Sequence, residues 1–230
     1  MELLEGINPA AMDPREHVIC RGCGMNARVR AVLDLARNHV GLGGDRHVYI
    51  MEQVTRAFVW MQQHLHCEVT GSEFESDSRK RLVLSDYLHR IGGVGSIEFN
   101  DVTCSRYEDS TFDAVVSFEV LEHVPNYPSA LAELSRNLKD GGLLIATFPF
   151  ADTQETIVRA RLDEQGKVEH LLEPEYHGDT ISGGILCWYH FGWDILDACA
   201  KNGFRRAKMV MPWNPAAGMH FGHWILMAIK

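Results

Sequence analysis

The sequence predicts an α/β fold built on a doubly wound, mainly parallel sheet. Between residues 27 and 149, short apolar segments typical of buried strands alternate with segments of helical apolar spacing. This alternation favours parallel strands joined by helices. The final two strand candidates, RAKMVM and WILMAI, are joined by a short connection, which predicts an antiparallel last strand. At 230 residues and 46% hydrophobic content, the chain can form one large domain.

The first half of the sheet is expected between residues 27 and 100. Apolar residues at helical spacing, from Val29 to Ala36, predict a helix over 27–40 that GLGG closes. The polar stretch that begins FESDSRKR is expected to be a connection. The other candidates in this half are a strand HVYIM (47–51), a helix QVTRAFVWMQQHL (53–65), a strand CEVTG (67–71) and a strand SIEFN (96–100).

The second half carries the remaining strands and an insertion. In chain order we expect a strand DAVVSF (113–118), a helix (128–139), a strand LLIATF (143–148), a hairpin (156–172), a polar loop (173–184) and a helix (192–204). We therefore divide the chain into an irregular N-terminal segment with a CxxC pair (1–26) and one domain (27–230). Within that domain, residues 150–190 are expected to cap the substrate.

Composition excludes several classes of partner. The formal net charge is −9, and both nucleic acid and anionic membranes require a basic surface. No apolar run approaches the ~20 residues of a membrane helix, and the acidic N-terminus is unlike a secretory signal. Six scattered cysteines do not form a disulfide framework. These features predict a cytoplasmic protein with a small-molecule substrate, and they leave open whether it forms a homodimer.

Acidic residues follow two of the predicted strands, at the edge where such sheets bind ligands. Glu73 follows the second strand and is placed to accept the hydroxyls of a ribose; the alternative is a solvated loop carboxylate. Asp101 follows the third strand and could accept from an adenine amine, while the backbone at Val102 packs on the ring. An Asx turn is the alternative for Asp101.

The most specific segments are FDAVVSFEVLEHVP (112–125) and LKDGGLLIATFP (138–149). They resemble the class I S-adenosylmethionine-dependent methyltransferases, especially the branch called type 11. The resemblance implies a Rossmann-like sheet of seven strands with the last one antiparallel. It also implies that Glu73 binds the ribose, that Asp101 binds the adenine amine, and that Ser117 and Glu119 line the methionine side.

The first strand-to-helix turn departs from this family. Most members have a glycine-rich E/DxGxGxG turn, whereas this chain has MEQVTR at 51–56. S-adenosylmethionine carries no phosphate, so its amino-acid end can be bound by side chains, and we expect Glu52, Gln53 and Thr55 to provide them. The alternative is a closed turn, which would leave a non-catalytic protein that binds another ligand or a partner.

Histidines and aromatic residues mark the expected acceptor site. An oxygen nucleophile must lose its proton, and histidine suits that role near neutral pH. We rank His177 first and His123 second as the general base. The expected substrate residues are Tyr176, Tyr189, His190 and Trp193. Structural roles for these side chains remain the alternative.

Two patterns raise the question of a metal. Glu119, Glu122 and His123 resemble a divalent-metal site of related quinone O-methyltransferases. Cys20 and Cys23 resemble half of a zinc knuckle, but a structural zinc site usually needs four ligands and no second pair follows. We expect a turn at the cysteines and no metal at either place, with both alternatives open.

The sequence thus predicts an S-adenosylmethionine-dependent methyltransferase acting on a small polar metabolite or sugar. HLLEPEYHGD and YHFGWDIL resemble bacterial members thought to methylate such molecules. O-methylation is expected because a histidine base is at hand, while N-methylation stays open. A nicotinamide-dependent dehydrogenase is disfavoured, because the glycine fingerprint is absent.

Overall fold

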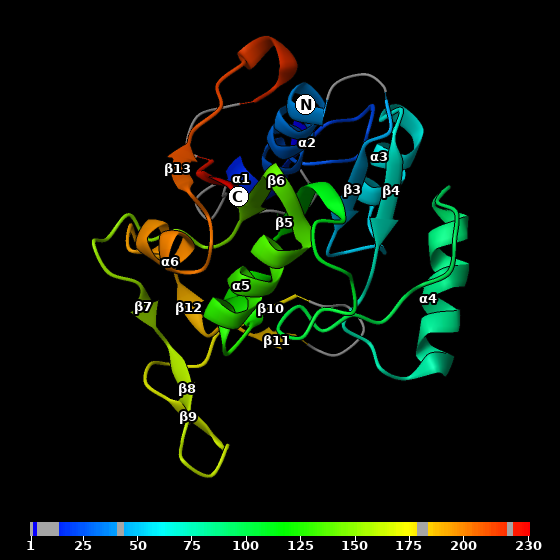
Figure 1. The fold of residues 1–230 in the computed structure, drawn as a ribbon. Coiled ribbons are helices and arrows are strands. Elements are labelled where there is room, and N and C mark those ends of the chain that lie inside the picture. The colour runs from blue at the N-terminus through cyan, green and yellow to red at the C-terminus, as the bar shows by residue number, and fades with distance from the viewer. Residues whose placement is uncertain (1, 4–13, 41–43, 179–183, 220–222) are drawn as a thin grey trace.

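A mixed sheet forms the centre of the protein, as seen in a computed structural model that describes residues 2–3, 14–40, 44–178, 184–219 and 223–230 (Figure 1). The strand order is β13-β14-β6-β5-β3-β4. The strands β3 to β6 are parallel, and β14 is antiparallel to both of its neighbours, which confirms the expected antiparallel last strand. The strands are β3 (His47–Ile50), β4 (Glu68–Gly71), β5 (Phe112–Phe118), β6 (Leu138–Thr147), β13 (Arg206–Val210) and β14 (Ile225–Ile229).

The third of the seven expected strands, SIEFN (96–100), is reduced to one parallel bridge between Glu73 and Phe99. The side chain of Gln53 explains why. Its Nε2 donates to the Ser96 carbonyl at 2.8 Å, and its Oε1 accepts from the Glu98 amide at 3.4 Å. These two backbone groups are therefore bound by a side chain. Within the described residues the sheet has six strands rather than the seven expected.

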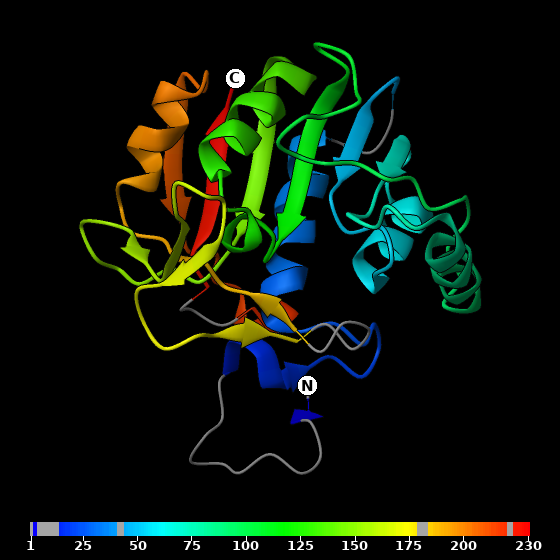
Figure 2. The same ribbon diagram turned by 90° about the horizontal axis from the view of Figure 1, so that it is seen from below.

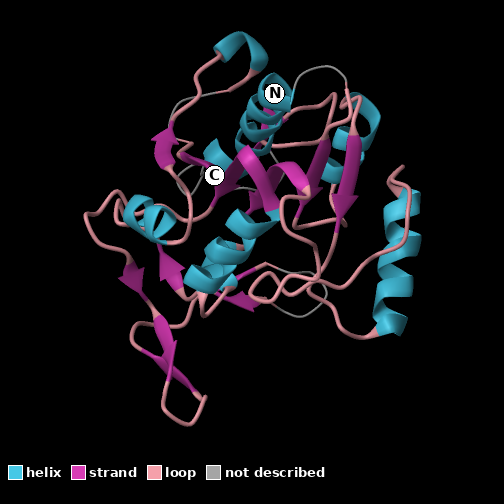
Figure 3. Ribbon diagram, viewed as in Figure 1, coloured by secondary structure: helices cyan, strands magenta, loops and turns pink. Residues whose placement is uncertain are grey.

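Helices cover both faces of the sheet, which makes it doubly wound (Figures 2 and 3). Val48 and Ile50 of β3 pack with the core that contains α2 and α3, whereas Tyr49 packs with α5 and α6 on the other face. This alternation follows from the two-residue repeat of a strand. The helices are α2 (Ala27–Val40), α3 (Arg56–His64), α5 (Tyr127–Asn137) and α6 (Ile195–Lys201).

Two segments that we expected to be irregular contain regular structure. The polar connection after β4 forms helix α4 (Ser78–Arg90), capped by the Asp77 side chain, and only Leu88 of this helix is buried. Leu84, Leu88 and Ile91 stand at helical spacing, a signal outweighed in our prediction by the charged residues that precede them. In the N-terminal segment, α1 (Pro14–His17) precedes β2 (Val18–Ile19), which pairs with β1 (Glu2–Leu3). The closing GLGG lies outside the described residues except for Gly44.

The expected insertion after β6 forms short antiparallel pairs. They are β7 (Ile157–Val158) with β12 (Tyr189–His190), β8 (Ala160–Leu162) with β9 (Val168–His170), and β10 (Tyr176–His177) with β11 (Ile185–Leu186). The predicted hairpin is β8–β9, which projects from the body (Figure 1). The β10–β11 ribbon lies across the carboxyl ends of the parallel strands (Figure 2).

Short 3₁₀ turns complete the described chain at η2 (Leu121–His123) and η3 (Pro215–Ala217). Among the described residues, the longest helices are too short or too polar to cross a bilayer.

Candidate active site

A cavity of about 1010 Å³ opens at the carboxyl ends of β3, β4 and β5, the edge at which such sheets bind ligands. Its wall combines strand ends, the N-terminal segment and the β10–β11 ribbon. The expected site residues that line it are Glu52, Glu73, Asp101, Val102, Glu119, His123, Tyr176, His177 and His190. Residues that are more than 120 positions apart in sequence therefore share one cavity.

Three expected cofactor residues lie in the framework behind the cavity wall. Gln53 is bound to the backbone at Ser96, as described above. The Thr55 hydroxyl accepts from the Phe58 amide at 3.2 Å and so caps α3. Ser117 is fully buried within β5. The contacts of Gln53 and Thr55 make these two side chains supports of the turn, whereas the buried Ser117 hydroxyl has no hydrogen-bond partner among the described residues.

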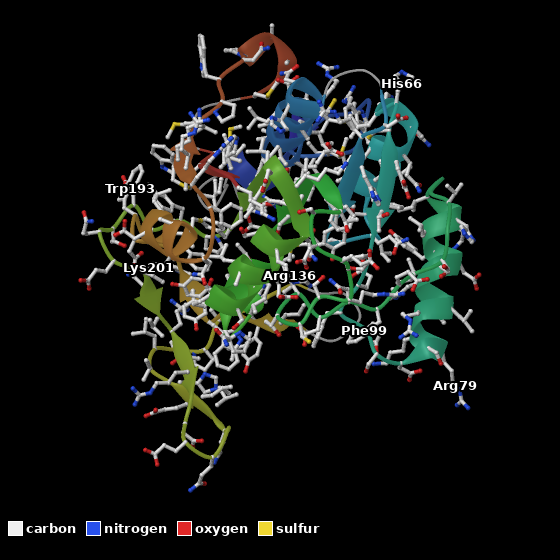
Figure 4. All side chains as sticks on the ribbon, in the orientation of Figure 1. His66, Arg79, Phe99, Arg136, Trp193 and Lys201 are labelled. Atoms are coloured by element: carbon white, nitrogen blue, oxygen red, sulfur yellow. The ribbon has the colours of Figure 1, made fainter. Side chains whose placement is uncertain are left out.

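Two expected substrate residues also lie away from the cavity lining. The Tyr189 hydroxyl donates to the Pro125 carbonyl at 2.6 Å. Trp193 donates through Nε1 to Asp152 at 2.8 Å and packs edge-on against Trp224. Figure 4 shows Trp193 on the side of the molecule opposite to Phe99, near α6.

Glu52, which follows β3, has a carboxylate of which only one oxygen is hydrogen-bonded. Its Oε1 accepts from the Phe118 amide at 2.6 Å, but its buried Oε2 has no hydrogen-bond partner among the described residues. Burial raises the pKa of Glu52 well above its ordinary value, and the charges of Glu73 and Glu122 add to this effect. A cation at Oε2 would satisfy this group.

A side chain holds the backbone of the glycine-free turn in place. Glu73 Oε1 accepts from the Val54 amide at 2.6 Å, so this carboxylate links the turn to the end of β4. In a glycine-rich turn the same amide would be open to a ligand. The turn of this chain is therefore ordered by its own acidic residue.

The adenine end of the expected site contains an Asx turn and an exposed aromatic ring. Asp101 Oδ1 accepts from the Thr103 amide at 2.8 Å and from the Thr103 hydroxyl at 2.7 Å. Asp101 thus forms the turn considered as its alternative role and still lines the cavity. Phe74, which is 77% exposed, lines the same region and offers a flat apolar face. Our sequence analysis did not identify it.

An ion pair between Arg28 of α2 and Glu16 of α1 completes the wall. Arg28 is buried and donates through Nε and Nη2 to both oxygens of Glu16, at 2.7 and 3.0 Å. Its Nη1 donates to Thr147 at 2.9 Å and lies 3.4 Å from Glu119 Oε1. The sequence offers one signal that could have identified Arg28: it is a charged residue on the apolar face of a helix, four positions before Val32.

The cavity is strongly acidic. Its lining includes one arginine, Arg28, and none of the described lining residues is a lysine. The carboxylates in the lining are those of Glu16, Glu52, Glu73, Asp101, Glu119 and Glu175. Such a field repels phosphates and attracts cations, which argues against a dinucleotide.

Four residues of the insertion, Glu175, His177, Cys187 and His190, form what we call the cap cluster. His177 Nε2 lies 2.8 Å from Glu175 Oε1, and His190 Nε2 lies 3.1 Å from the same oxygen. Cys187 and then Glu122, whose Oε1 is 3.5 Å from His177 Nδ1, raise the pKa of His177 to about 11. Both ring nitrogens of His177 therefore face carboxylates.

His123 is bound differently. Its Nδ1 lies 2.9 Å from the Leu186 carbonyl, which can only accept, so Nδ1 carries the proton and Nε2 keeps the lone pair of the neutral ring. The ring packs edge-on against His177 and lines the cavity. This is the tautomer that a general base requires at Nε2.

Two groups of side chains have metal-binding geometry. They are Glu122 with His123 and His177, and Glu175 with His177 and Cys187. Glu119, the remaining member of the ExxEH pattern, instead faces Arg28. Within the described part of the chain, Cys20 and Cys23 belong to neither group.

Comparisons with known proteins relate part of this chain to a family of enzymes. Residues 51–146 match a family model described as a methyltransferase domain. The ubiquinone biosynthesis O-methyltransferase of Agrobacterium fabrum (strain C58) is 25% identical over 146 residues, which are 62% of this chain and 52% of that protein. The chain thus spans about half the length of the curated relative that it matches.

Solved structures share the fold at low identity. A methyltransferase of Mesorhizobium loti has 17% identity and a TM-score of 0.54, with 86% of this chain and 96% of that chain covered. The 1,6-didemethyltoxoflavin-N1-methyltransferase of Burkholderia thailandensis, solved with its acceptor and S-adenosylhomocysteine, has 16% identity and a TM-score of 0.54, with 89% and 78% covered. The fold is therefore shared with S-adenosylmethionine-dependent methyltransferases, and residues 51–146 match a methyltransferase domain.

Proposed function

We propose that this protein transfers the methyl group of S-adenosylmethionine to an oxygen of a small polar metabolite or sugar. The observation that carries the proposal is Glu52, a buried carboxylate with one unpartnered oxygen in an acidic cavity at the end of the first parallel strand. S-adenosylmethionine has an ammonium and a sulfonium against one carboxylate. Its net positive charge suits this cavity.

The residues around the cavity divide into roles for the cofactor. Glu52 would accept from the ammonium through its unpartnered oxygen. Glu73, at the end of β4, would accept from the ribose hydroxyls, and Asp101 from the adenine amine with Val102 beside the ring. Arg28, held by Glu16 and close to Glu119, would supply the positive charge near the carboxylate of the cofactor.

The transfer itself is an in-line displacement. An acceptor oxygen attacks the methyl carbon, the carbon–sulfur bond breaks, and its electron pair stays on sulfur to give neutral S-adenosylhomocysteine. The protein must hold the reacting atoms about 3–3.5 Å apart and exclude water. The acceptor proton passes to a base, and we assign that role to His123 Nε2, which lies 3.7 Å from Glu122 Oε1. Both nitrogens of His177 lie closer to carboxylates, at 3.5 and 2.8 Å.

The acceptor class rests on the other end of the cavity. Tyr176 and His123 line the cavity there, and rings that carry hydrogen-bonding groups fit a hydroxylated molecule with apolar faces. The curated relative named an O-methyltransferase supports oxygen over nitrogen as the nucleophile.

Formation of S-adenosylhomocysteine tests this assignment. The protein and cofactor are incubated with panels of sugars, phenols and primary amines, and product is measured by mass spectrometry. We expect acceptor-dependent turnover with hydroxylated compounds. Turnover with amines alone would overturn the choice of oxygen. If the chain binds neither S-adenosylmethionine nor S-adenosylhomocysteine, the non-catalytic alternative holds instead.

A further inference from the structure

The backbone of the insertion brings chemically unlike side chains to one face of a ribbon. In the pair β10–β11, Tyr176 lies opposite Leu186 and His177 lies opposite Ile185. The Cys187 amide donates to the Glu175 carbonyl at 2.8 Å, which continues this register by one pair. Because side chains alternate along a strand, Glu175, His177 and Cys187 project from the same face.

The donor atoms of these side chains lie within the reach of one ion. Oxygen, nitrogen and sulfur ligand atoms of Glu175, His177 and Cys187 are all within 4.8 Å of one another. His190 Nε2, from β12, lies 3.1 Å from Glu175 Oε1 but is not one of the donor atoms that are mutually within 4.8 Å. Zinc bonds of ~2.0–2.3 Å in a tetrahedron put donor atoms roughly 3.3–3.8 Å apart, so the first three side chains need small movements and the His190 ring must turn toward them to become the fourth ligand.

Glu122 provides a second, independent observation. This residue is fully buried, and neither of its carboxylate oxygens has a hydrogen-bond partner among the described residues. Its Oε1 lies 3.5 Å from His177 Nδ1, the nitrogen that faces away from Glu175. A histidine that binds a metal through one nitrogen commonly donates its other N–H to a carboxylate. Such a bond would satisfy Glu122.

We propose that the cap cluster binds a zinc ion through Glu175, His177, Cys187 and His190, with Glu122 as the outer partner of His177. A thiolate and two imidazoles favour zinc over magnesium or calcium, which prefer oxygen ligands. Binding removes the proton from the Cys187 thiol and uses the neutral rings of both histidines. Four protein ligands close the coordination sphere, so the ion fastens the β10–β11 ribbon to β12 at the acceptor end of the cavity. The inference goes beyond methyl transfer and does not depend on it.

Metal content tests the proposal directly. The purified full-length chain is stripped with a chelator, reloaded with Zn²⁺ and titrated against a chromophoric chelator that competes for the ion. The double variant C20S/C23S serves as the control, because it removes the CxxC pair, which could also bind zinc. We expect one zinc per chain in both proteins.

Variants of the cluster locate the ion. Glu122→Gln should lower zinc affinity by ~10–100-fold, the loss expected for an outer partner. Cys187→Ser and His190→Gln, which remove ligands, should each lower zinc affinity by more than that. Cys187 is buried, so its variant is checked by circular dichroism. If it does not fold, the half-buried His190 carries the test.

Cobalt substitution identifies the ligands. Co²⁺ in the proposed site should show a thiolate-to-cobalt charge-transfer band that persists in C20S/C23S and disappears in Cys187→Ser. A site built from Glu122, His123 and His177 would give no such band. The proposal fails if the wild-type chain binds no zinc. It also fails if zinc is lost in C20S/C23S and retained when Cys187 or His190 is replaced.

Discussion

The buried carboxylate of Glu52 is only partly hydrogen-bonded. It lies in the interior with one hydrogen bond from the Phe118 amide, and its other oxygen has no hydrogen-bond partner among the described residues. An unsatisfied buried oxygen costs about 1–3 kcal/mol, and a ligand that donates to it recovers this energy. In the proposed function, this side chain binds the amino-acid end of the cofactor and so compensates for the glycines missing from the neighbouring turn.

The pH dependence of binding tests this role. Burial, and next the neighbouring acids, raises the pKa of Glu52 in the free protein, whereas a bound ammonium favours the ionised form. Affinity for S-adenosylmethionine should therefore increase as the pH rises towards the raised pKa of the free protein, and level off above it. Calorimetry at several pH values should record proton release, and Glu52→Gln should abolish it.

A matched ligand provides the control for that experiment. 5′-Methylthioadenosine has the same nucleoside but no amino-acid end, so its affinity should not follow the ionisation of Glu52. Equal pH slopes for the two ligands would contradict the contact between Glu52 and the ammonium.

The general base is tested by replacement and chemical rescue. His123→Gly should lower kcat by about 10²–10⁴-fold, the usual contribution of such a base, and leave cofactor affinity unchanged. Added imidazole should restore part of the rate. A variant that binds the cofactor and turns over at the wild-type rate would exclude His123.

Sequence reasoning reached only part of the site at this scale. Glu73 and His123 could be named because each follows a recognisable strand or motif. Arg28 and Glu16 could not, since their pairing joins two helices whose relative position depends on tertiary packing. Trp193 stays a prediction as a substrate residue: it is not among the residues that line the cavity, and its half-buried ring packs against Trp224.

At the scale of elements, Asp113 ties three parallel strands together at the edge opposite the cavity. Its carboxylate accepts from the His47 amide at 2.9 Å and pairs with Lys139 at 2.7 Å and Arg46 at 3.0 Å. Burial acts to raise the pKa of Asp113, but the contacts with Lys139 and then the His47 amide outweigh it, so the pKa is lowered.

Replacing this carboxylate should weaken the sheet. Asp113→Asn should lower the free energy of unfolding by about 1–3 kcal/mol, because one acceptor cannot satisfy three donors. The stabilisation is present above the ordinary pKa of 3.8 and is lost as the pH falls through the lowered pKa. Urea denaturation should therefore give a difference between variant and wild type at pH 7 that shrinks in strong acid. A pH-independent difference would contradict the ionic contribution.

The sequence predicted elements well where burial leaves a pattern. Strand β5 has six buried residues among its seven, and α2 keeps its apolar stripe, so both could be read directly. Helix α4 has one buried residue, and the short apolar spacing of Leu84, Leu88 and Ile91 was missed beside its many charged residues. The segment 96–100 has the composition of a strand, but the Gln53 side chain binds its backbone groups, a contact that composition cannot reveal.

At the scale of the whole molecule, charge and topology act together. The chain carries a formal net charge of −9, and carboxylates gather where the parallel strands end. Transfer of the methyl group removes the positive charge of the sulfonium. The acidic cavity therefore attracts the substrate form of the cofactor more strongly than its product, which favours product release.

This electrostatic preference predicts a difference in salt dependence. Raising ionic strength should weaken S-adenosylmethionine binding more than S-adenosylhomocysteine binding, because screening acts on the additional charge of the sulfonium. The ratio of the two Kd values, measured by calorimetry at low and high salt, reports this effect. A ratio that does not change would show that the acidic lining contributes little to the discrimination.

The central claim is that a turn without glycines still binds the cofactor through side chains. Calorimetric titration of S-adenosylmethionine into the wild-type protein, Glu52→Gln and Glu68→Gln tests it most directly. Glu68 is a control because it is an exposed carboxylate at the opposite end of β4. We expect saturable binding by the wild type and Glu68→Gln, and at least tenfold weaker binding by Glu52→Gln, which corresponds to ~1.4 kcal/mol. A well-folded wild-type protein that gives no heat of binding, or equal affinities for all three proteins, would contradict the account.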